Sequence, residues 1–185
     1  MQDGNAASAR RPVVALIGSW WHEGAHGVLP ASLGSACVIM YLVSVARLSL
    51  VDVLHHRLPR VWVHQLSLVL GIGLPASALC GGEPARVLTS AAGALGTRLL
   101  YGTVRALSPA WLGRGDVRLA PVLGAACGFV SPVHAVAAVV LTFGACGAWG
   151  TFLVLSRRAR PHDRIAMGPW MSGCSTLVWL ALAPT

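Results

Sequence analysis

Long apolar runs alternate with short loops that carry Arg along most of this sequence. The runs cover residues 28–51, 61–80, 87–104, 117–131, 133–155 and 165–183. Most of them approach the roughly 20 residues that a helix needs to cross a bilayer. Because lipid offers the backbone no hydrogen-bonding partner, open strands are excluded. The pattern therefore predicts an all-α, polytopic membrane helix bundle with about six transmembrane helices.

The fourth run, residues 117–131, is the shortest of the six. At 1.5 Å per residue it covers roughly 22 Å, less than a hydrocarbon core of about 30 Å. Either the bilayer thins there or this helix begins below the membrane surface. In the second case the preceding turn, which ends at Asp116, is sunk into the membrane edge. Irregular backbone at that depth needs protein or a wet cavity beside it.

Composition and charge agree with a membrane protein. The chain is 55% hydrophobic and 11% charged, whereas soluble domains are about 25% charged. Its net charge is +8, and all its basic residues are Arg. Because these Arg residues lie between apolar runs, they indicate a positive-inside bias rather than nucleic-acid binding. The five cysteines form no C-x-x-C pair, so we expect buried thiols and no zinc ribbon or disulfide framework.

The Arg counts also predict sidedness. Loops 52–60, 105–116 and 156–164 are rich in Arg, whereas loops 81–86 and 131–132 are nearly free of charge. We expect the first group to face the cytosol and both termini to face outward, although Arg10 and Arg11 run against this assignment. The apolar stretch 12–21 is too short to span. Residues 1–27 are therefore predicted to be an extracytosolic or interfacial tail, and residues 28–185 a membrane-embedded domain.

Two of the six acidic residues lie at predicted membrane edges. Asp52 ends the first run and Asp116 precedes the fourth, and the Arg counts place both at the cytosolic face. Carboxylates in such places are costly and usually functional. Two neighbouring carboxylates share a proton, so that one acts as an acid and the other as a base toward a water. Spacing alone equally allows a helix N-cap at Asp116 and a solvated helix end at Asp52.

Three segments carry a family resemblance. Residues 52–60, DVLHHRLPR, resemble the first motif of type IV prepilin peptidases, an Asp followed after five residues by an aliphatic residue and Pro. Residues 113–119, GRGDVRL, resemble the GxGD motif of that family, and residues 165–169, IAMGP, resemble its late Gly-Pro stretch. Gly124 and Gly128 stand where the family often has glycine. The resemblance covers about residues 42–173, and it departs from the family at Arg60, Arg118 and Ala166.

The resemblance implies a short membrane aspartic peptidase of the GxGD type, with Asp52 and Asp116 as catalytic residues and no cofactor or metal. It implies a prepilin or pseudopilin substrate, cleaved at the cytosolic face of the bacterial plasma (inner) membrane. The residues expected to shape the site or bind substrate are Gly113, Gly115, Pro59, Arg118, Gly168 and Pro169. Because the Cys-rich insert of longer members does not occur here, we expect a peptidase without N-methyltransferase activity.

Two other functions remain open at this point. Residues 22–26, HEGAH, match the H-E-x-x-H pattern of zinc metalloproteases, which requires both His on one face of a helix. Gly24, Gly27 and Pro30 make such a helix unfavourable. A small proton-coupled transporter could also use membrane Asp residues as relays. It would favour carboxylates near the midplane and matched broken helices, and the sequence has neither feature.

Overall fold

The computed structural model describes residues 12–55, 60–109, 112–158 and 167–181, and of residues 52–55 and 60 it describes the backbone alone. This part of the chain is helical and contains no strand. The helices are α2 (Val13–His22), the 3-10 turn η1 (Gly24–His26), α3 (Val28–His55), α4 (Arg60–Cys80), α5 (Ala85–Leu107), α6 (Arg114–Val130), α7 (Pro132–Leu155) and α8 (Gly168–Ala181). The predicted all-α fold class is confirmed.

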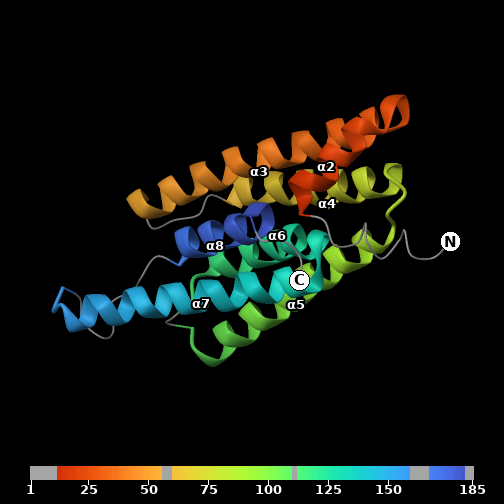
Figure 1. Cartoon of the computed structure of the whole chain (residues 1–185). Coiled ribbons are helices and arrows are strands. Elements are labelled where there is room, and N and C mark those ends of the chain that lie inside the picture. Colours follow the sequence, from red (N-terminus) through yellow and green to blue (C-terminus); the bar gives the residue numbers. More distant parts are fainter. Residues whose placement is uncertain (1–11, 56–59, 110–111, 159–166, 182–185) are drawn as a thin grey trace.

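Helices α3 to α8 form one bundle in which successive helices run in opposite directions (Figure 1). Helices α3, α5 and α7 therefore finish at the same end at which α4, α6 and α8 begin. We call this the Arg end, because the Arg-rich loops of the sequence join the helices there. The most extensive contact is between α5 and α6, and α4 and α8 each pack against both α3 and α6.

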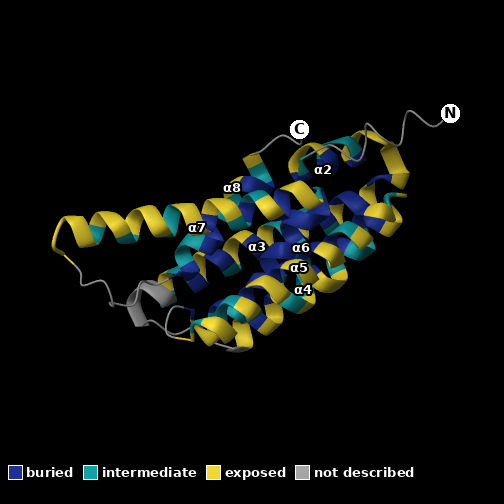
Figure 2. Cartoon of the chain, turned by 90° about the horizontal axis from the view of Figure 1, so that it is seen from below, coloured by how far each residue is buried: buried dark blue, intermediate teal, exposed yellow. Residues whose placement is uncertain are grey.

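Each of the six predicted apolar runs coincides with one of the helices α3 to α8. Three helices are long and apolar enough to cross a membrane, at Val28–Val51, Val61–Cys80 and Pro132–Leu155. Helices α6 and α8 are shorter, with 17 and 14 residues, and α5 carries Arg86, Arg98 and Arg105. Large apolar side chains cover much of the outer surface, above all on α7 (Figure 2). Such a surface suits contact with lipid.

Glycines bring α5 and α6 into direct backbone contact. A Cβ on Gly93 of α5 would overlap the carbonyl oxygen of Gly124, and one on Gly128 would lie 2.5 Å from the Thr89 carbonyl oxygen. The close approach places the Ala120 carbonyl 3.0 Å from the Thr97 hydroxyl, which shares its single proton between this oxygen and the Gly93 carbonyl at 2.8 Å. This is the close packing that small residues permit between membrane helices. It fixes the register of α5 against α6, and hence the height of Asp116.

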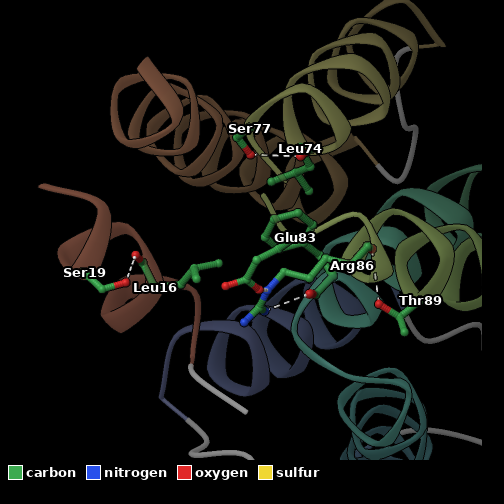
Figure 3. Close-up of polar contacts among 8 residues, drawn as sticks. Leu16, Ser19, Leu74, Ser77, Glu83, Arg86 and Thr89 are labelled. Carbon is green, nitrogen blue, oxygen red and sulfur yellow. Dashed lines mark hydrogen bonds and ion pairs between the residues drawn. The ribbon is translucent and has the colours of Figure 1, made fainter. Parts of the chain in front are cut away.

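An ion pair ties the opposite end of the bundle together (Figure 3). The buried Arg86 guanidinium, 3% exposed, pairs with the Glu83 carboxylate and donates to the Phe129 carbonyl at 3.1 Å. It also lies 5.7 Å from the centroid of the Phe129 ring. Phe129 belongs to the last turn of α6, where carbonyls have no partner within the helix. Arg86 therefore provides a hydrogen-bond donor for a free carbonyl at the C-terminal end of α6. Asp116 lies in the first turn of the same helix.

Residues 13–22, within the segment that the sequence predicted to be a tail, form α2. The apolar side of this helix, Val13, Leu16, Ile17 and Trp20, is buried against α3 and α8. The Trp20 ring lies against Gly81 in the turn after α4, where a Cβ would come within 2.5 Å of a ring carbon. Helix α2 is too short to span a membrane. Its apolar side is nevertheless long enough to bury four side chains against the bundle.

Candidate functional site

Asp116 lies in the first turn of α6, at the Arg end. The helix begins at Arg114, so Asp116 is its third residue and Gly113 is the N-cap. The carboxylate accepts the Gly113 backbone N–H at 3.1 Å, which satisfies one of the free donors at the helix start. Negative charge in the first turn is also favoured by the helix dipole. Asp116 is nonetheless 8% exposed, a degree of burial that a helix cap does not require.

Helices α5, α7 and α8 all pack against α6, which carries this carboxylate. On α5, Tyr101 is buried and stacks on Phe143 of α7, with ring centroids 5.3 Å apart. A side chain at position 113 would come within 2.9 Å of the Asp116 carboxylate oxygen, so the carboxylate would have to shift. Gly113 therefore leaves room for the carboxylate, and its backbone conformation, with φ at −68°, is ordinary.

A small cavity lies one turn deeper in the bundle, and its lining is mostly apolar. It has a volume of about 10 Å³, the size of a single water molecule, and the polar side chains in its lining are Thr97, Tyr101, Thr142 and Ser175. A few polar side chains therefore lie in the interior between α5, α6, α7 and α8.

Asp52 belongs to the last turn of α3, also at the Arg end (Figure 1). Its backbone and that of Asp116 thus lie at one end of the bundle, on helices separated by α4 and α8. The Asp52 side chain falls outside the described part of the structure, and so does Pro59.

The other expected site residues lie around the same end. Gly115 is part of the first turn of α6, and the exposed Arg118 follows one turn later. Gly168 is buried and begins α8, with Pro169 as its second residue. Proline in the first turn of a helix loses no backbone hydrogen bond. All four therefore occupy the beginnings of the two helices that pack against each other below the Arg end.

Arg105 contributes to the site in a way that the sequence did not predict. From the last turn of α5, its guanidinium donates to the carbonyl of the buried Leu112, directly before Gly113. In the sequence, Arg105 indicated only the sidedness of its loop. No signal within the local sequence distinguishes it from the other loop arginines, because the contact depends on how the loop folds back.

We expect Arg105→Gln to lower roughly tenfold the rate of any reaction that the Asp116 carboxylate catalyses, with little change in KM, because a loosened turn misplaces this carboxylate. Arg105→Lys should restore part of the rate. Initial rates of the purified variants on a prepilin-like peptide, the substrate that the resemblance implies, measure this effect. Full activity in Arg105→Gln would show that the bond to Leu112 does not position the turn.

The HEGAH segment does not form one helix. Helix α2 ends at His22, and the separate 3-10 turn begins at Gly24. The two histidines therefore do not share the helical face that a zinc protease needs. Among the described residues, no group of three His, Cys, Asp or Glu side chains is arranged to hold a metal ion.

Comparison with protein families, curated proteins and solved structures finds no match to this chain. Within the residues that the structure describes, the fold is all-helical, and three helices are long and apolar enough to span a membrane. Any more specific assignment depends on the residues at the Arg end.

Proposed function

We propose that this protein is a membrane aspartic endopeptidase that removes the leader peptide from prepilin-like substrates. The observation that carries the proposal is the buried Asp116 carboxylate, seated on the N–H of Gly113 at the end of the bundle where α3 brings Asp52. The GxGD resemblance supports the same reading. A carboxylate that merely capped a helix would not need to be buried, and Asp116 is 8% exposed.

The chemistry proposed for the pair begins with one carboxyl protonated and the other ionised. The ionised group takes a proton from a water as the water oxygen bonds to the scissile carbonyl carbon. The protonated group gives its proton to the carbonyl oxygen. The tetrahedral diol then collapses, the C–N bond breaks, and the amide nitrogen leaves as an amine with a proton from the pair. Neither cofactor nor covalent intermediate takes part.

The proposed substrate is a hydrophobic helix preceded by a short basic leader. Such a helix would lie in the bilayer beside the bundle, with its cleavage point at the membrane edge. Under the positive-inside rule the Arg end faces the cytosol of a bacterial plasma (inner) membrane, so cleavage is proposed on that side.

The direct test uses the whole chain, purified and reconstituted in liposomes, with a synthetic prepilin-like peptide. We expect cleavage between the leader and the hydrophobic segment, with one oxygen atom from heavy-oxygen water in the new carboxylate. Added hydroxylamine should capture no acyl-enzyme. Absence of cleavage by folded protein, or formation of a hydroxamate product, would contradict the aspartic mechanism.

The zinc alternative predicts a different result from two substitutions. We expect His22→Ala and His26→Ala to leave the rate of leader cleavage within about twofold of the wild type, since neither side chain is buried and no helix joins them. Metal chelators should have no effect. Loss of cleavage in these variants, restored by added zinc, would identify a metalloprotease instead.

A further inference from the structure

A second cavity at the Arg end is lined by positive charge. It has a volume of about 510 Å³ and lies between α4, α5 and α6, where Val61, Val63, His64, Ser67, Arg98 and Arg118 line it. We call it the Arg98–Arg118 cavity. The hydrogen bond from Thr97 to Ala120 sets the register of α5 against α6. This register brings the two arginines to the same height on neighbouring helices.

Neither arginine has an anionic partner among the side chains that the structure describes. The ion pair within that set joins Arg86 to Glu83 at the opposite end. Two guanidinium groups on neighbouring helices repel each other, and the low dielectric near a membrane strengthens the repulsion. The cavity is therefore electrostatically suited to an anion. Guanidinium groups bind phosphate with paired, charge-assisted hydrogen bonds.

The cavity lies near one end of a candidate membrane span. Val61 is the first residue of a candidate membrane span, so His64 is about 5 Å further along the helix axis. The neighbouring Trp62 is partly exposed, as is usual for aromatic residues at a membrane interface. A basic pocket between membrane helices on the cytoplasmic side is typical of binding sites for anionic lipids.

An apolar track continues from the cavity along the outside of the bundle. On α4, Leu68 and Ile72 follow His64 at intervals of one turn, and both are exposed, at 52% and 66%. On α5, Leu95 lies one turn from Arg98 and is also exposed. A free phosphate ion would make no contact with this apolar track, whereas the acyl chains of a lipid would cover it. The arrangement thus matches a molecule with an anionic head and an apolar tail.

We propose that the Arg98–Arg118 cavity binds the phosphate headgroup of an anionic phospholipid, with the acyl chains along α4 and α5. The proposal rests on the geometry and charge of the cavity and not on the proposed peptidase activity, although Arg118 is also one of the residues that the family resemblance places around the peptidase site. The bound lipid supplies the counter-charge for both arginines and fills the space between three helices at the Arg end.

The test measures lipid binding to the purified whole chain by native mass spectrometry and by thermal unfolding. Dioleoyl-phosphatidylglycerol should bind and raise the unfolding temperature, whereas dioleoyl-phosphatidylcholine and inorganic phosphate should not. Arg98→Gln and Arg118→Gln should each weaken phosphatidylglycerol binding roughly fivefold or more. Arg118→Lys, which keeps the charge but loses the planar fork, should fall between wild type and Arg118→Gln.

Arg47→Gln is the matched control, since Arg47 is an exposed arginine within α3 that does not line the cavity. It should bind phosphatidylglycerol as the wild type does. An equal loss in Arg47→Gln would show diffuse attraction by net charge and overturn the site. Stabilisation by inorganic phosphate as strong as that by phosphatidylglycerol would make it a site for a free anion. The wild-type comparison of the three ligands decides the proposal even if one variant does not fold.

Discussion

Asp116→Asn and Asp52→Asn are each expected to abolish processing of a co-expressed prepilin, a loss of roughly 10³-fold or more. Asn has nearly the shape of Asp, and its side-chain oxygen can still accept the Gly113 N–H that Asp116 accepts at 3.1 Å. Folding and membrane insertion should therefore be preserved. The amide cannot exchange a proton, so neither acid nor base catalysis survives at that position. The measurement is the gel shift from prepilin to mature pilin at equal peptidase abundance.

The double variant sharpens this prediction. If the two carboxyls act as one pair, losing either should cost about as much as losing both. Asp163→Asn is the control, because Asp163 belongs to the loop 156–164 that the sequence assigns to the same side of the membrane. It should process prepilin normally. Normal processing by Asp116→Asn or Asp52→Asn would exclude the aspartic mechanism, whatever the state of the lipid site.

Gly93→Ala is expected to lower the free energy of unfolding by about 2–3 kcal/mol, as overpacking of a tight interface does. The added Cβ would overlap the Gly124 carbonyl oxygen and approach the Gly128 Cα to 3.0 Å. Both partners are backbone atoms of α6, so the helices would have to move apart. The separation would also weaken the hydrogen bond from Thr97 to Ala120 and shift the Asp116 turn. Equilibrium unfolding in mixed micelles, followed by tryptophan fluorescence, measures the change.

Gly96→Ala provides a control on the same helix. No atom lies within 4 Å of the Cβ that it would add, and Ala is favoured over Gly inside a helix by roughly 1 kcal/mol. We therefore expect equal or higher stability in Gly96→Ala. A similar loss in both variants would mean that glycine acts on α5 through flexibility, and that the contact with α6 is not tight.

The sequence predicted the helices well because each is an apolar run bounded by charge or by Gly and Pro. The fourth run shows how far this reasoning reaches. The sequence placed this run at residues 117–131, after a turn that ends at Asp116, whereas the structure begins α6 at Arg114, with Asp116 inside its first turn. The expected turn therefore shrinks to the N-cap at Gly113. Helix starts are difficult to place within a turn, because the first residues make no backbone hydrogen bond of their own.

Contacts between distant segments were not predictable in the same way. Arg86 was counted as part of a nearly bare loop, yet it reaches the Phe129 carbonyl at the end of α6. Arg105 donates to the Leu112 carbonyl, and glycines bring the backbones of α5 and α6 into contact. A single sequence shows which residues are costly to bury. It does not show which partner offsets that cost, because the partner lies elsewhere in the chain.

The packing of the Trp20 ring against Gly81 has a consequence for biosynthesis. The residue that receives the indole ring is translated roughly 60 residues after the ring itself. The side of the Trp20 ring that rests on Gly81 therefore stays uncovered until the turn after α4 has left the ribosome. Arrested nascent chains that end before Gly81 should leave Trp20 more accessible to a quencher than longer chains do. Helix α2 is thus made well before the residues that complete its packing.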